Sequence, residues 1–235
     1  MISLPLGQVQ IRERTGVGCV AENGFCPDWI ADNIGDYMDP LWRHVELVVA
    51  SVACGFAIAF ALALLAHRRR WLTGPIVGIT GILYTIPSLA LFALLIPLTG
   101  FGFVTALIPL TAYTLLILFR NIAAGLDNVP DETRDAARGM GLTERQVLWK
   151  VELPLALPEI FAGLRVATTT TVGLAALAFY AGAGGLGKQI LSDIAFKSNI
   201  VVAGLLCVVL AFVLDVALLG LQRLLVPWQR ARATA

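Results

Sequence analysis

The chain has 235 residues with a formal net charge of +1; 58% are hydrophobic, only 14% are charged, and the mean hydropathy is +0.81. Ordinary globular chains are roughly 45–50% apolar and about 25% charged, so a soluble fold of this length could not cover so much apolar surface. The near-neutral charge also gives no basis for nucleic-acid binding. The composition therefore indicates a membrane protein.

Long stretches without a charged residue predict the membrane spans. They cover residues 47–66, 71–119, 166–187 and 198–214. About 20 apolar residues of helix cross a bilayer core, so the second stretch is long enough for two helices, and Pro97, Gly100 and Gly102 divide it. The sequence predicts an all-α polytopic membrane protein with about five transmembrane helices, at 45–66, 74–97, 103–124, 160–180 and 199–222.

The distribution of basic residues predicts the orientation. Ten of the seventeen Lys and Arg residues follow the first span, lie between the third and fourth, or follow the fifth, and Arg120 and Arg165, at the adjoining ends of the third and fourth spans, raise the number on this side to twelve. By the positive-inside rule these segments face the cytoplasm, so the N-terminus is outside and the C-terminus is cytoplasmic. We expect an extracytoplasmic segment 1–44, a membrane domain 45–222 with a cytoplasmic loop 125–159, and a cytoplasmic tail 223–235.

Two cysteines lie in the segment predicted to face the oxidising side. Cys19 and Cys26 enclose the turn signal Asn23-Gly24. A disulfide between them is the prediction, with two independent thiols as the alternative. His44 and His67 lie at opposite ends of the first span, so no metal-ligand spacing exists and no metal site is expected.

The segment 182–189 contains a glycine-rich pattern that imitates two phosphate-binding motifs. It fits both G-x-G-x-x-G and the start of a Walker A loop. The first motif needs a preceding β-strand, and the second needs a Ser or Thr where Gln189 stands. We therefore expect the glycines to form only a sharp turn at the end of a span.

The predicted cytoplasmic loop contains two helix signals. Pro130 followed by two acidic residues begins the first helix, which Gly139 and Gly141 end. A second, amphipathic helix follows over 142–149, with Thr143 and Gln146 as a capping box. Its stripe consists of Leu142, Gln146 and Trp149. Such a helix suits docking into a groove of a soluble partner, and the alternative is a helix lying on the lipid surface.

The same loop resembles a family signature, Glu-Ala-Ala, three residues, Gly, nine residues, Ile-x-Leu-Pro, of the permeases of ABC importers. The matching residues are Asp135, Ala136, Ala137, Gly141, Val151, Leu153 and Pro154, where Asp135 replaces Glu and Val151 replaces Ile. The resemblance implies a type I importer in which a cytoplasmic ABC ATPase docks on this loop. It also implies a second permease subunit, of the same chain or a paralogue, and an extracytoplasmic solute-binding protein. ATP and Mg²⁺ would be bound by the ATPase, with no cofactor and no catalytic residue in this chain.

Other stretches are similar to one subfamily of these permeases. They are residues 84–92, 162–171 and 182–187, which resemble permeases for osmoprotectants such as glycine betaine, carnitine and choline. A permease for methionine or other amino acids is the alternative. An ATP-independent secondary transporter or channel is a further one, which the absence of a visible inverted repeat disfavours.

Polar residues within the spans are candidates for the translocation path and for an ion pair. The path candidates are Tyr84, Thr85, Pro87 and Ser88, where Pro87 predicts a kink, together with Thr168 and Thr171. Asp215 lies inside the fifth span. Because intramembrane acids usually pair, Arg165 is its expected partner, with Arg120 as the second candidate.

Overall fold

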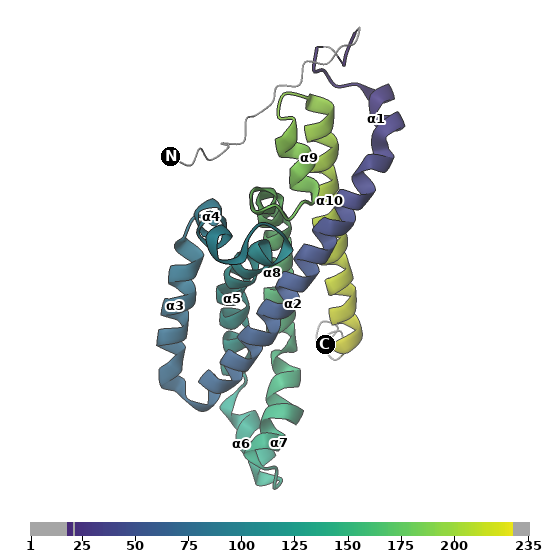
Figure 1. Ribbon diagram of the computed structural model, residues 1–235. Helices are drawn as coiled ribbons and strands as arrows, with labels where there is room; N and C mark the ends of the chain where they lie inside the picture. The colour runs from purple at the N-terminus through teal and green to yellow at the C-terminus, as the bar shows by residue number, and fades with distance from the viewer. Residues whose placement is uncertain (1–17, 21, 228–235) are drawn as a thin grey trace.

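The structure is a computed structural model that describes residues 18–20 and 22–227, and every regular element in those ranges is a helix, as Figure 1 shows. In chain order they are α1 (Pro27–Asn33), the 3₁₀ turn η1 (Ile34–Tyr37), α2 (Met38–Arg68), the 3₁₀ turn η2 (Arg70–Leu72), α3 (Thr73–Thr85), α4 (Ser88–Thr99), α5 (Phe103–Asp127), α6 (Asp131–Gly139), α7 (Glu144–Val147), the π-helical turn η3 (Leu148–Glu152), α8 (Leu153–Ala175), the 3₁₀ turn η4 (Ala176–Ala181), α9 (Leu186–Ser192) and α10 (Lys197–Leu225). The prediction of an all-α fold is confirmed.

Several helical segments are long and apolar enough to cross a membrane. Among the described residues these are Pro27–Arg68, Phe103–Asp127, Glu144–Ala181 and Lys197–Leu225. The helices α3 and α4 are long and apolar enough to cross a membrane only when taken together, and they are bent by 93° relative to each other. Counting this pair as one span gives five. The predicted number of about five spans is therefore confirmed.

The second predicted span, 74–97, is broken rather than kinked. The helix α3 ends at Thr85 and α4 begins at Ser88, and the two residues between them are extended, with ψ of 129° at Ile86 and 132° at Pro87. The ring of Pro87 disfavours the helical conformation for the preceding residue, Ile86, and proline itself has no N–H to donate to a helix hydrogen bond. Both effects act at neighbouring positions, so the chain forms two helices at a large angle.

The centre of the molecule is a bundle of α2, α5 and α8 (Figure 1). Its buried side chains form two layers along the bundle, which include Leu118, Phe119, Ile122 and Ile160 in one layer and Leu47, Val48, Leu110 and Val172 in the other. Small residues let the helices approach closely. A Cβ added to Gly163 of α8 would lie 2.4 Å from the Cβ of Asn121 on α5. Such contacts between helix backbones are typical of membrane-helix packing.

At the end of the molecule that holds α1 and α9, a disulfide closes a short loop. Cys19 and Cys26 are bonded, with their Cα atoms 5.8 Å apart. The Cys26 N–H donates to Ser198 Oγ at 2.8 Å, and the Ser198 hydroxyl donates to the Gly24 carbonyl at 3.0 Å. The closed loop is therefore attached to the first turn of α10.

The glycine-rich segment turns the chain between η4 and α9. Three of its residues have positive φ: Gly182, Gly184 and Gly185. The buried ring of His44 on α2 accepts a hydrogen bond from the Leu186 N–H at Nδ1 and donates from Nε2 to the Val172 carbonyl. The expected sharp turn at the end of a span is therefore confirmed, and no strand precedes it within the described chain.

Candidate functional site

The tip formed by α6 and α7 lies at the opposite end of the molecule from α1 and α9 (Figure 1). At the end of α6 the chain reverses through Gly141, which has φ +85°. The Gly141 N–H donates to the Arg138 carbonyl at 2.9 Å, and the Leu142 N–H donates to the Ala137 carbonyl at 3.2 Å. These two bonds form a Schellman motif, in which glycine is favoured because a side chain would be strained at positive φ.

A capping box begins the next helix. The Gln146 N–H donates to Thr143 Oγ1 at 3.4 Å, and the Thr143 N–H donates to Gln146 Oε1 at 2.8 Å. This helix, α7, then passes through the π-helical turn η3 directly into α8. The sequence suggested a separate short helix over 142–149, whereas the structure joins it end to end with the fourth span. The tip helix and the fourth span therefore form one continuous helical segment, Glu144–Ala181.

A buried ionic network fixes the tip to the bundle. Arg134 of α6 donates from Nε to Glu152 Oε1, from Nη1 to Asp131 Oδ1 and from Nη2 to the Leu126 carbonyl, each at 2.7 Å. His67, near the end of α2, places Nε2 at 2.9 Å from Glu152 Oε2. The side chains of Arg134 and Glu152 are only 9% and 6% exposed. The network thus joins α6 to α2, to α5 and to the start of α8.

The partners of Arg134 keep its guanidinium charged in this setting. Burial acts to lower the pKa of Arg134, but the hydrogen bonds and negative charges of Glu152 and Asp131 outweigh it and raise the pKa overall. A buried charge without such partners would be costly.

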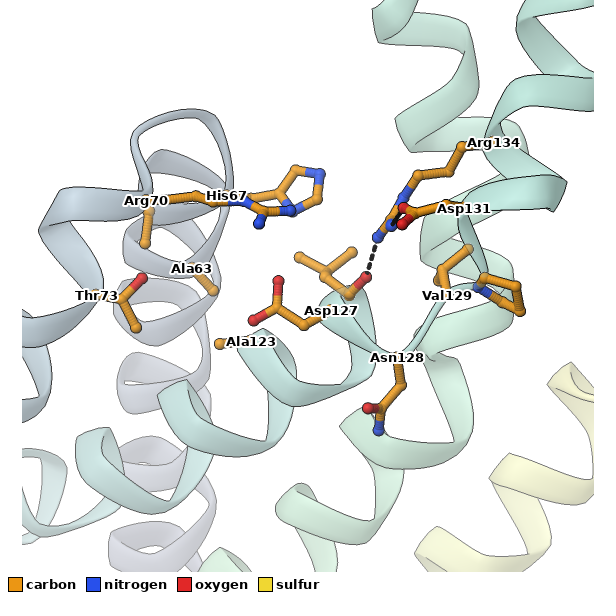
Figure 2. A pocket seen from close by; sticks show the side chains of 13 residues that line it. Ala63, His67, Arg70, Thr73, Ala123, Asp127, Asn128, Val129, Asp131 and Arg134 are labelled. Carbon is orange, nitrogen blue, oxygen red and sulfur yellow. Dashed lines mark hydrogen bonds and ion pairs between the residues drawn. The ribbon is translucent and has the colours of Figure 1, made fainter.

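Two cavities lie beside this network. One, of about 460 Å³, is shown in Figure 2, with His67 and Arg70 on one side and Asp131 and Arg134 on the other. The second, of about 620 Å³, shares these four residues and extends to Arg145 of α7. The first cavity has a mixed polar and apolar lining, whereas every residue that lines the second is polar or charged except Leu148.

The residues expected to couple to a partner form two groups: exposed residues at the tip, and more buried residues where η3 meets α8. Exposed side chains at the tip are Asp135, Ala136, Gln146 and Trp149, together with Gly141, and Leu142 is half-buried. Where η3 meets α8, Leu153 is buried and Val151 and Pro154 are half-buried, and Ala137 is a buried residue of α6 itself. The sequence did not indicate the network of Arg134, Glu152 and His67. The only signal for it was the charge of Glu152 between the apolar Val151 and Leu153.

Residues expected on the translocation path surround the break between α3 and α4. Tyr84 is 40% exposed and packs edge to face against Tyr113 of α5, with ring centroids 6.0 Å apart. The Tyr113 hydroxyl donates to the Ile86 carbonyl, and the Thr85 hydroxyl donates to the Ile82 carbonyl. Pro87 is exposed and Ser88 is half-buried. The break therefore presents an aromatic ring beside polar backbone groups.

The two threonines of α8 do not join this group in the structure. Thr168 and Thr171 are buried, and their hydroxyls donate to the carbonyls four residues earlier, each at 2.7 Å. The helix α5 packs against both α3 and α8. Both threonine hydroxyls therefore bond to backbone carbonyls of α8 itself and are not part of the group around Tyr84.

Arg165 and Asp215 form a two-pronged ion pair between α8 and α10. Arg165 Nε donates to Asp215 Oδ1 and Nη2 donates to Oδ2, both at 2.7 Å. A guanidinium that meets both carboxylate oxygens is a strong and directional contact. It connects the outermost long helix to the central bundle.

Within the described residues no group of three or more His, Cys, Asp or Glu side chains could hold a metal ion.

Comparison with known proteins assigns the class of protein. Residues 53–231 match the family described as binding-protein-dependent transport system inner membrane component, and the chain belongs to that family. It is the permease subunit of a type I ABC importer, a multi-pass protein of the inner membrane.

Individual relatives and structures agree with this assignment. The chain is 39% identical over 206 residues to the osmoprotectant import permease protein OsmW of Salmonella typhimurium, covering 85% of this chain and 96% of that protein. It is 34% identical to the choline transport system permease protein OpuBB of Bacillus subtilis, covering 85% and 93%. A solved structure of the MetNI methionine ABC transporter in an inward-facing conformation matches with a TM-score of 0.72 and 26% identity, covering 80% of this chain and 95% of that one.

Proposed function

We propose that the segment 135–154 is the coupling element that receives a cytoplasmic ABC ATPase. The observation that carries this proposal is the continuity of the tip with α8 through η3, because a rigid helical connection can transmit a force from the tip into the membrane. The contact surface would be centred on Asp135, Ala136, Gly141 and the exposed Met140. In this arrangement the partner ATPase binds ATP and Mg²⁺, and this chain supplies no catalytic group.

The solute in this proposal is a quaternary ammonium osmoprotectant such as glycine betaine, carnitine or choline. The relatives named for osmoprotectant and choline transport are 34–39% identical, whereas the methionine transporter structure is 26% identical. Aromatic faces attract quaternary ammonium groups, and Tyr84 presents one beside the break between α3 and α4. An extracytoplasmic binding protein would deliver the solute, and a second permease subunit would complete the path.

The coupling proposal is tested by Gly141→Val. Because Gly141 has φ +85°, a β-branched side chain there is strained by an amount of the order of 1–3 kcal/mol and should reorient α7. We expect membrane insertion and yield to be unchanged. Co-purification of the ATPase and solute-stimulated ATP hydrolysis should fall roughly tenfold.

Gly139→Ala is the matched control, since Gly139 lies within α6 and an added Cβ there meets nothing within 4 Å. This variant should keep both ATPase association and hydrolysis. If Gly141→Val also keeps both, the tip does not dock on the ATPase, and a helix resting on the lipid surface becomes the better interpretation.

The solute class is tested separately, with the intact transporter and its binding protein in proteoliposomes. Glycine betaine, carnitine or choline should stimulate ATP hydrolysis, and methionine should not. Stimulation by methionine alone would assign the chain to amino-acid import.

A further inference from the structure

An apolar groove runs between α2 and the junction of α7 with η3. It has a volume of about 400 Å³. Ala61, Leu64 and Leu65 form its α2 wall, and Leu148 and Trp149 form the other. Its α2 wall belongs to the charge-free part of the first span, which ends at Ala66. The groove is therefore at the depth where hydrocarbon gives way to the membrane surface.

The groove continues into the polar cavity of about 620 Å³ described above. Arg68, Arg145 and Leu148 line both spaces. The apolar groove and this polar cavity, called the basin below, thus meet at the guanidinium groups of Arg68 and Arg145. A ligand that fills both must be amphipathic, with an anionic head and an apolar tail.

The charges at this junction are not neutralised by the protein. Two other arginines of the basin are paired, Arg134 with Asp131 and Glu152, and Arg138 with Asp135 and Glu144. Arg68, Arg70 and Arg145, in contrast, have no ion pair within the part of the chain that the structure describes. The basin therefore has an excess of positive charge where the groove opens.

Trp149 supports a location at the membrane boundary. Its side chain is 51% exposed and lines the groove opposite the leucines of α2. Tryptophan is enriched at membrane–water interfaces, where its apolar ring and its N–H are both satisfied. Basic pockets between membrane helices at this level suit anionic lipid headgroups.

We propose that this junction is a binding site for an anionic phospholipid. The headgroup phosphate lies in the basin between Arg68 and Arg145, and one acyl chain lies along the groove beside Leu65 and Trp149. A free phosphate would use the basin but gain nothing from the groove. Trp149, which the sequence placed on the partner-docking stripe, is assigned here to the lipid.

The test compares lipid retention by the intact transporter, purified in detergent and analysed by native mass spectrometry. Dioleoyl-phosphatidylglycerol is the anionic probe, dioleoyl-phosphatidylcholine the neutral one, and inorganic phosphate the probe without a tail. The double variant Arg68→Gln/Arg145→Gln should bind phosphatidylglycerol roughly thirtyfold more weakly, since each basic group near the surface contributes roughly five- to sixfold. Ala61→Phe, which fills the groove and leaves the charges intact, should cause a loss of the same kind.

Arg69→Gln is the matched control, because Arg69 belongs to the same arginine run but lines neither space. It should retain phosphatidylglycerol like the unmodified chain, and all forms should retain phosphatidylcholine equally. Equal affinity of the unmodified chain for both lipids would overturn the proposal. So would phosphate displacing the lipid from the unmodified chain, or a double variant that keeps its lipid and loses only the ATPase, which would make the ATPase the occupant.

Discussion

Glu152 connects the tip to the bundle through both of its carboxylate oxygens. One carboxylate oxygen accepts from Arg134 and the other faces His67. Replacing it by Gln removes the charge that compensates a buried guanidinium, and losing one member of a buried pair typically costs about 3–5 kcal/mol. We expect Glu152→Gln to lower the thermal unfolding midpoint of the purified chain clearly, measured by tryptophan fluorescence in detergent.

The exposed ion pair of the same loop provides the control for this variant. Glu144 accepts from Arg138 at 2.8 and 3.2 Å, and the side chain of Glu144 is 75% exposed. The Arg138 hydrogen bond lowers the pKa of Glu144, yet solvent screens such surface pairs and they contribute little to stability. Glu144→Gln should therefore leave the unfolding midpoint almost unchanged. An equal drop for both variants would mean that burial gives Glu152 no special role.

For individual residues, the distance along the sequence between two partners decides whether their contact was predictable. The turn at Gly141 and the box of Thr143 with Gln146 involve residues within five positions, and the residue types alone indicate them. The contacts of Glu152 span 18 residues to Arg134 and 85 to His67. No local pattern specifies such pairs, because they depend on how α2, α5 and α8 pack.

Close packing of helix elements gives a further prediction. A Cβ on Gly163 would lie 2.4 Å from the Asn121 Cβ, an atom that cannot rotate away, so α5 and α8 must separate in Gly163→Ala. We expect a lower unfolding midpoint and reduced transport from this single methyl group, since well-packed interfaces tolerate added volume poorly. Gly173→Ala on the same helix meets nothing within 4 Å and should be neutral. If the two variants unfold alike, the contact does not constrain the helices.

The elements themselves were predictable in kind and place, but not always in shape. Pro87 indicated where the second span is interrupted, yet the 93° angle depends on the extended backbone at Ile86 and on the Tyr113 hydroxyl that bonds its carbonyl. The π-helical turn at 148–152 had no signal in residue type. Charge-free length predicts a span, whereas the direction in which it leaves a break is set by its neighbours.

For the whole molecule, the two ends differ in what stabilises them. One end carries the disulfide loop and α1, attached to α10 through Ser198 and through the Tyr37 hydroxyl on Asn199. These elements precede the family match, which begins at residue 53. The other end depends on ionic contacts around Glu152. A disulfide suits an oxidising compartment and ATPase docking suits the cytoplasm, so each end has features appropriate to the side that the basic residues predict.

Site-directed labelling tests this orientation. Lys188 on α9 and Thr143 at the tip are both exposed in the structure and lie at opposite ends of the molecule (Figure 1), so a difference in labelling reports the side of the membrane rather than burial. In a chain with Cys54→Ser and Cys207→Ser, a membrane-impermeant thiol reagent added to intact cells should label Lys188→Cys and leave Thr143→Cys unmodified. Permeabilised cells should label both, which shows that Thr143→Cys is reactive. Labelling of Thr143→Cys in intact cells would place the tip outside, where no cytoplasmic ATPase could reach it, and the coupling proposal would then fail together with the orientation.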